Sequence, residues 1–212
     1  MLRDGAIRTR QEMWDVSDPA HPQFVTIIVD GLRSTHKNWW ECDTGIAYLV
    51  SQESTWRKRK TMIYDLSVPT RPRFIRDFGL DGQQPGSTLE PAPAPIHGPI
   101  SWQGRVYFAY GSSNNGSIQI VDRDKLINGN PDPTTANLLA PQIGRLDMPR
   151  YWGGHTTYPV LAMPIKEFEK DTVGSVRDIL VVASETVRDE CKGPRHPVFF
   201  LDMTEPDRPF PI

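Results

Sequence analysis

Three histidines stand at corresponding places in the chain, each at the entry to a stretch that reads as a strand. They are His36 in Ser-Thr-His, His97 in Pro-Ile-His and His155 in Gly-Gly-His. Neutral imidazole nitrogens are ligands for iron, copper and zinc. If the fold brings these entries together, the three histidines are candidate ligands of a metal ion.

After each of the three histidines comes a second apolar stretch, and a polar residue follows that stretch. Two of these three polar residues are carboxylates. The residues are Glu53, Asn114 and Glu185. A carboxylate beside a metal-binding histidine accepts its second ring N–H and fixes the tautomer of the ligand. We therefore expect Glu53 and Glu185 to support the histidines if these bind a metal.

The same histidines also have a structural explanation. A repeat protein reuses residues because each repeat solves the same packing problem, and a histidine at a strand start can bond to the backbone of a neighbouring repeat. A third explanation is a ligand-binding rim without metal. His21 and His196 lie beside prolines in turns and are assigned no role.

The loop before His155 holds two aromatic residues, Tyr151 and Trp152, followed by Gly153 and Gly154. Aromatic side chains next to glycines are suited to lining a binding pocket. Tyr151 and Trp152 are therefore candidate pocket-wall residues.

An internal repeat organises the positions of all these residues. An apolar strand that ends in Asp and continues into a Ser/Thr- and Pro-containing turn occurs three times, at residues 14–25, 64–75 and 201–212, and residues 120–125 keep only the strand and its Asp. Asp in such a turn accepts hydrogen bonds from nearby backbone N–H groups. We expect this role for Asp15, Asp65, Asp122 and Asp202.

Further strand candidates lie between these turns. Residues 46–51, 106–110 and 179–184 are almost continuously apolar, which is typical of strands buried on both faces. Four short strands in a period of about 50 residues, with few helical signals, predict the blade of an all-β propeller. The expected segments are a half blade at 10–29, blades at 36–78 and 97–146, and a nearly complete blade at 155–212 with an insertion at 163–176.

The strand, the Asp-Val-Ser-Asp-Pro turn and the later histidine together resemble the LVIVD-repeat family of β-propellers, over essentially the whole chain. The resemblance implies a propeller and a periplasmic or extracellular location, although the chain starts without the apolar core of a signal peptide. Our leading hypothesis is a binding or interaction domain that presents a site for a small molecule or protein at its central face. The alternative is a metal-dependent, oxidoreductase-like enzyme that uses the histidine cluster.

About three and a half blades do not close a ring, because propellers have roughly 4–8 blades. We expect the chain to be a fragment of a larger propeller whose missing blades complete the ring, or to be completed by a second chain.

Composition excludes several other classes of protein. The 212 residues contain 24 basic and 26 acidic side chains, so the excess of positive charge that marks a nucleic-acid-binding protein is missing. No apolar run approaches the roughly 18 residues of a membrane-spanning helix. Nucleotide-binding, nucleophile-elbow, zinc-protease and Cys-x-x-Cys motifs are also absent, and Cys42 and Cys191 stand alone.

Overall fold

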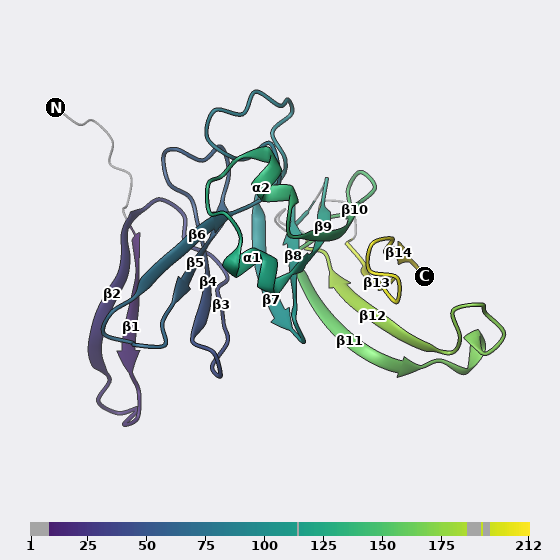
Figure 1. The fold of residues 1–212 in the computed structure, drawn as a ribbon, viewed down its shortest axis with the longest axis horizontal. Helices are drawn as coiled ribbons and strands as arrows, with labels where there is room; N and C mark the ends of the chain where they lie inside the picture. The colour runs from purple at the N-terminus through teal and green to yellow at the C-terminus, as the bar shows by residue number, and fades with distance from the viewer. Residues whose placement is uncertain (1–8, 114, 186–191, 193–195) are drawn as a thin grey trace. The chain divides into compact units, whose positions relative to one another are not determined.

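A computed structural model describes residues 9–113, 115–185, 192 and 196–212 of the chain (Figure 1). Strands make up 44% and helices 7% of the fold, which is therefore all-β. None of the described helices has the length and apolar character needed to cross a membrane. The elements are β1 (Thr9–Asp15), β2 (Gln23–Leu32), β3 (Trp39–Trp40), β4 (Ile46–Ser51), β5 (Lys60–Asp65), β6 (Arg73–Phe78), β7 (Ile96–Trp102), β8 (Arg105–Tyr110), β9 (Ser117–Asp122), α1 (Arg123–Asn128), α2 (Thr135–Leu139), β10 (Gln142–Asp147), β11 (Thr156–Pro164), the 3₁₀ helix η1 (Lys166–Phe168), β12 (Val176–Ala183), β13 (Val198–Asp202) and β14 (Phe210–Pro211).

The strands form four antiparallel sheets in which strands consecutive in the chain are hydrogen-bonded neighbours. The hairpin β1–β2 forms a sheet of its own, and three four-stranded sheets follow in the orders β3–β4–β5–β6, β7–β8–β9–β10 and β11–β12–β13–β14. The predicted segments 36–78 and 155–212 each contain one of these sheets, and the sheet β7–β10 extends one residue beyond each end of the predicted segment 97–146. The 3₁₀ helix η1 lies within the predicted insertion 163–176.

The chain divides into two compact units. The first is Met1–Pro93 together with Asn130–Leu138, and the second is Ala94–Gly129 together with Leu139–Ile212. The hairpin β1–β2 and the sheet β3–β6 belong to the first unit, and the sheets β7–β10 and β11–β14 belong to the second.

The repeated aspartates stabilise the turn or helix that follows each strand. Asp15, Asp65 and Asp202 each accept a hydrogen bond from the backbone N–H two residues later, at 2.8–2.9 Å. Asp122 instead caps α1 and accepts from the N–H of Lys125 at 2.9 Å. The predicted role of these residues is confirmed, because in all four copies the carboxylate satisfies an N–H group that has no partner in a sheet ladder.

Within each unit, one sheet packs face to face on the next. In the second unit the core joins Tyr107, Ala109, Ile118, Ile120 and Met148 to Leu180, Val182, Phe199, Leu201 and Met203. In the first unit it joins Met13 and Leu32 to Ala47, Leu49, Met62, Tyr64 and Leu66.

These two cores use the same repeat positions. Ile46 pairs with Asp65 and Ile179 pairs with Asp202, so Ala47 corresponds to Leu180 and Leu49 to Val182. Both sheets thus turn the same face toward the preceding sheet.

Gly144 shows how closely the sheets of the second unit approach. A Cβ atom at this position would lie 1.9 Å from the carbonyl oxygen of Pro206, in the turn between β13 and β14. Only glycine fits there without displacing backbone, so the packing of the two sheets requires this residue.

Candidate metal centre

His97 lies at an irregular point of β7, the first strand of its sheet. Ile96 pairs with Tyr110 and Gly98 pairs with Ala109, which leaves His97 as an extra residue in the ladder. A bulge of this kind bends the strand and re-aims the side chain of the extra residue. His97 is 6% exposed, so the side chain is held inside the second unit.

His155 stands directly before β11, the first strand of the next sheet. Its N–H donates to the carbonyl of Ala183 at the end of β12, at 2.9 Å. The preceding Gly153 lies against the loop after β8, where a Cβ atom would come within 1.9 Å of the carbonyl oxygen of Gly111. The glycines before His155 therefore serve close backbone contact, and this contact brings His155 to the neighbouring sheet.

Glu185 follows β12 by two residues. Its N–H donates to the carbonyl of Ser112 at 2.9 Å, and Ser112 belongs to the loop after β8 of the neighbouring sheet. The N–H of Gly154 likewise donates to the carbonyl of Tyr110 at 2.9 Å, so backbone hydrogen bonds between the two sheets position Glu185 and the residue before His155.

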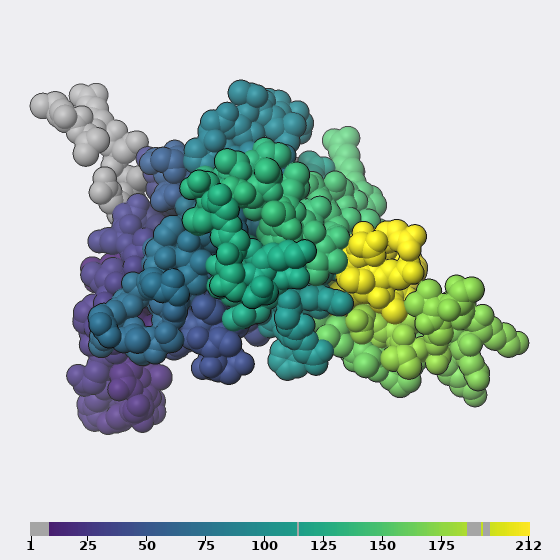
Figure 2. Space-filling view, in the orientation of Figure 1, coloured from purple at the N-terminus to yellow at the C-terminus, as the bar shows by residue number. Residues whose placement is uncertain are grey.

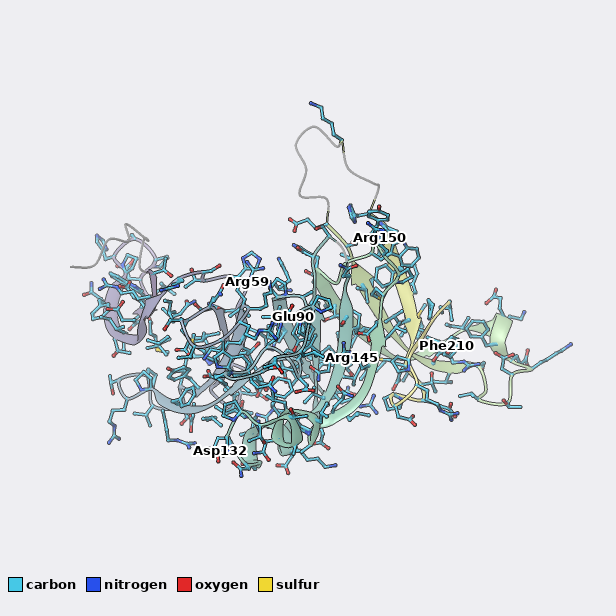
Figure 3. All side chains as sticks on the ribbon, turned by 90° about the horizontal axis from the view of Figure 1, so that it is seen from above. Arg59, Glu90, Asp132, Arg145, Arg150 and Phe210 are labelled. Carbon is cyan, nitrogen blue, oxygen red and sulfur yellow. The ribbon has the colours of Figure 1, made fainter. Side chains whose placement is uncertain are left out.

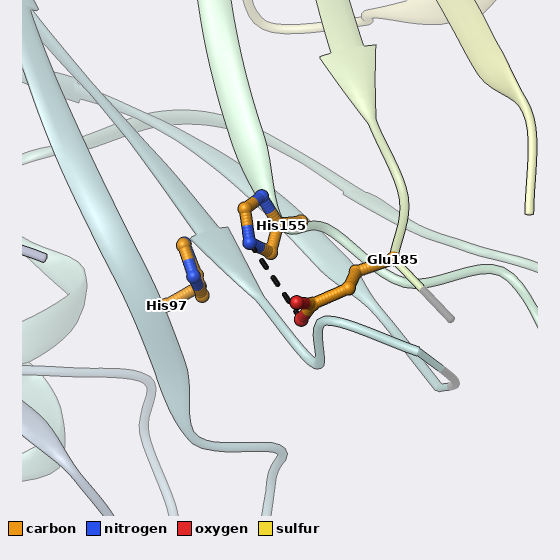
Figure 4. A group of neighbouring side chains, drawn as sticks. All are labelled: His97, His155 and Glu185. Carbon is orange, nitrogen blue, oxygen red and sulfur yellow. Dashed lines mark ion pairs between the residues drawn. The ribbon is translucent and has the colours of Figure 1, made fainter. Parts of the chain in front are cut away.

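These three side chains meet at one place (Figure 4). The ring centroids of His97 and His155 are 3.4 Å apart, with 33° between the ring planes. Nε2 of His155 lies 3.6 Å from Oε2 of Glu185. One ligand atom from each of the three residues lies within 4.8 Å of the other two.

The arrangement has the chemistry of a metal centre. Imidazole nitrogens and carboxylate oxygens bind a transition metal at about 2.0–2.2 Å, so ligands of one ion lie at most about 4.4 Å apart. The three ligand atoms lie within 4.8 Å of one another, slightly more than this limit, and the side chain of Glu185 is 43% exposed. Two histidines and one carboxylate leave coordination positions open for a further ligand.

The hydroxyl of Thr156 orients the second histidine. Nδ1 of His155 lies 2.8 Å from Oγ1 of Thr156, and Nε2 faces Glu185. When Nδ1 carries the proton and donates to Thr156, Nε2 presents its lone pair to a metal, which is how outer partners select the tautomer of a metal ligand.

The chain matches no protein-family model, and no curated protein matches it. The site is therefore assigned from the geometry of its own residues. Among the described residues, His97, His155 and Glu185 form the only group of three or more His, Cys, Asp or Glu side chains that meets this geometric condition.

His36 belongs to the first unit and is not part of this group. Its side chain is exposed, and its N–H donates to the carbonyl of Val50 at 3.0 Å. His155 makes the same kind of backbone bond to Ala183. The repeat thus reproduces the backbone position of the histidine in both units.

Glu53, the other predicted supporting carboxylate, pairs with Lys60. The side chain of Lys60 is 1% exposed and pairs also with Asp77, and its ammonium lies 5.2 Å from the ring centre of Trp56. Burial raises the pKa of Asp77, although the charge of Lys60 acts in the opposite direction. Asn114 lies outside the described residues.

Tyr151 and Trp152, the predicted pocket-wall residues, have different environments. Trp152 packs against the core between the two sheets and stacks on Phe199, with ring centroids 5.4 Å apart. Tyr151 is 49% exposed, has a φ of 72° and lies under the guanidinium of Arg150 at 5.0 Å. Core packing therefore accounts for Trp152, and Tyr151 lies on the surface.

Two residues that support the site have no signal in the sequence. The turn position of His196 beside a proline predicts no role for it, but its Nδ1 lies 3.1 Å from Oγ of Ser184, which accepts a hydrogen bond from the N–H of Gly153. This chain of contacts holds the loop that leads to His155. Its members are distant in the sequence, so only the fold reveals their contact.

Proposed function

We propose that this protein binds one divalent transition-metal ion through His97, His155 and Glu185. The observation that carries this proposal is the convergence of three ligand side chains from two neighbouring sheets, with one ligand atom of each within 4.8 Å of the others. Exposure increases from the buried His97 to the half-exposed Glu185. A metal held there has one side shielded by the sheets and another open to solvent.

The open side favours chemistry at the metal as well as binding. Two histidines and one carboxylate with free positions are the ligand set of non-haem iron(II) oxygenases, and zinc hydrolases use two histidines and a glutamate. Iron, copper and zinc are thus the candidate ions. When bound, the metal supplies a Lewis acid or redox centre, and the three side chains hold it beside the open face. A metal-dependent, oxidoreductase-like enzyme is the function that this site supports best.

We propose further that the sheets are blades of a β-propeller similar to LVIVD-repeat proteins. Two observations support this fold: consecutive strands form each four-stranded sheet, and the same repeat positions pack sheet on sheet in both units. The first strands of propeller blades start near the central channel, which accounts for the meeting of His97 and His155. The periplasmic or extracellular location implied by the resemblance belongs to the same proposal.

A binding or interaction domain without metal is the second candidate. The observation in its favour is the apolar surface of the sheet β11–β14, where Tyr158, Val198 and Phe200 are each 47–62% exposed. Under this function the histidines stabilise the packing of the sheets, and their replacement lowers stability alone.

Metal content separates the two candidates. The complete chain is purified without chelator or nickel affinity and measured by elemental mass spectrometry, beside His97→Ala, His155→Ala and the control His21→Ala. His21 is an exposed turn residue whose Nδ1 contacts Asp18, so its loss leaves the centre intact. We expect one ion per chain in the wild type and the control, and loss of the ion in the other two variants.

A wild-type protein that takes up no iron, copper or zinc after incubation with each ion would overturn the metal proposal. Equal metal content in all four proteins would do the same, because the ion would then be bound elsewhere. In either case, a lower melting temperature of His97→Ala and His155→Ala would support the second candidate.

A further inference from the structure

One face of the sheet β11–β14 is covered. The other face is apolar and exposed over Tyr158, Val198 and Phe200, and it is buried at one end, where Arg177 pairs with Asp202. Leu180, Val182, Phe199 and Leu201 lie in the core of the second unit. The opposite face carries Tyr158 and Phe200, which lie on the two strands next to β12 and both pair with its Val181. The C-terminal residues, yellow in Figure 2, lie at the surface, and Phe210 on the edge strand β14 is 50% exposed (Figure 3).

The repeat indicates what covers a face of this type. Met13, Ile120 and Phe200 each stand two residues before the repeated aspartate and are equivalent. Met13 is 8% exposed and packs against the next sheet of the first unit, and Ile120 is fully buried against the next sheet of the second unit. Phe200 is 47% exposed. In both covered cases the partner is an antiparallel sheet of the same repeat.

The hairpin β1–β2 carries the complementary exposed face. Trp14 stands one residue before the repeated Asp15 and is equivalent to Tyr64 and Leu201. The side chains of Tyr64 and Leu201 lie in the two cores, where each packs toward the preceding sheet. Trp14 is 47% exposed and packs edge-on against Phe24 at 5.4 Å, as Tyr64 packs against Phe74 at 5.3 Å. Thus one exposed face has the pattern that accepts a following sheet, and the other has the pattern that accepts a preceding sheet.

We propose that the exposed face of β11–β14 binds the hairpin β1–β2 of a second copy of this chain. The contact continues the sheet-on-sheet packing of the two cores, with Phe200 in the role of Ile120 and Trp14 in the role of Leu201. It joins two different surfaces and is therefore head-to-tail, which produces a closed ring or an extended chain of copies. It depends on the repeat register and is independent of the metal centre.

Analytical ultracentrifugation of the complete chain over a range of concentrations tests this contact. The variants are Phe200→Lys and Trp14→Lys, and the control is Leu89→Lys, which changes an exposed apolar residue outside both faces. We expect the wild type and the control to rise above the 24.0 kDa of one chain with increasing concentration. Each of the two face variants alone should stay at that mass.

An equimolar mixture of the two face variants gives the sharper result. Phe200→Lys keeps an intact β1–β2 face and Trp14→Lys keeps an intact β11–β14 face, so the mixture should form pairs and nothing larger. A wild type that stays a single chain at every concentration would overturn the proposal. Self-association of either variant alone, or a mixture that stays unpaired while the wild type associates, would also overturn it. Unchanged circular dichroism of the variants establishes that they are folded.

Discussion

The two units each carry a glutamate two residues beyond the second strand of a sheet, but the two glutamates have different partners. Glu53 follows β4 and pairs with the buried Lys60 of its own sheet. Glu185 follows β12 and lies 3.6 Å from His155. The repeat places a carboxylate at the same point of both sheets, and the neighbouring side chains decide whether it joins an ion cluster or the proposed metal centre.

The residue at the start of the third strand accounts for the difference. Lys60 occupies this position in the first unit, where it pairs with Glu53 and Asp77. The equivalent residues of the second unit are Ser117 and Pro197, by the pairing of Tyr110 with Ser117 and the hydrogen bond of Ser184 to Pro197. Neither carries a positive charge, so this position leaves the carboxylate of Glu185 available to the histidines.

Replacing each glutamate with glutamine should separate the two roles. In Glu185→Gln the loss of an anionic ligand should weaken metal binding at least about tenfold, because changes even to outer partners of metal ligands cost about 10–100-fold. In Glu53→Gln metal affinity should be unchanged, and the loss of one partner of a buried lysine should lower stability by about 1–2 kcal/mol. Titration of the metal-free proteins with metal, and thermal unfolding, measure the two effects.

The comparison is contradicted if Glu53→Gln weakens metal binding or if Glu185→Gln leaves it unchanged. Weaker metal binding in Glu53→Gln would mean that the first unit contributes to the centre. A Glu185→Gln protein with wild-type metal affinity would remove the carboxylate from the ligand set.

A smaller effect concerns the turn aspartates, which the units share. Hydrogen bonds from Ser67, followed by Arg73, lower the pKa of Asp65 from 3.8 to about 2. Because the pKa of Asp65 is lower in the folded than in the unfolded chain, the carboxylate stabilises the fold at pH values above its unfolded pKa of about 4. This contribution is lost as the pH falls from about 4 to about 2. Asp65→Asn should reduce stability at neutral pH by about 1 kcal/mol and flatten its dependence on pH in this range. Unfolding in urea between pH 2 and 7 measures both, and an unchanged acid limb would contradict the role of Asp65.

Much of the fold could be predicted from the sequence because the repeat encodes it locally. The apolar segments 46–51 and 106–110 lie in β4 and β8, in which nearly every residue is buried. The turn aspartates bond as expected, because an Asp-Ser turn is determined by residues adjacent in the chain. His97, His155 and Glu185 could be selected as candidates, since each stands at a repeated position.

The details of the site could not be predicted because they depend on contacts between sheets. The bulge that turns His97 inward arises from the register of β7 with β8. The pairing of Glu53 with Lys60 depends on a side chain across the strand pair, and periodicity carries no information about it. Trp152 resembles a loop residue in the sequence, but the approach of two sheets places it against Phe199.

The number of imidazoles bound to an added metal ion tests the central claim most directly. Pulsed electron paramagnetic resonance of the complete chain, loaded with one equivalent of Cu²⁺, counts coordinated histidines by their coupling to the ion. The proposed metal centre of His97, His155 and Glu185 predicts two coordinated imidazoles, unchanged in the control variant His21→Ala. Copper that binds with no imidazole, with one, or at several sites of mixed character would contradict the account.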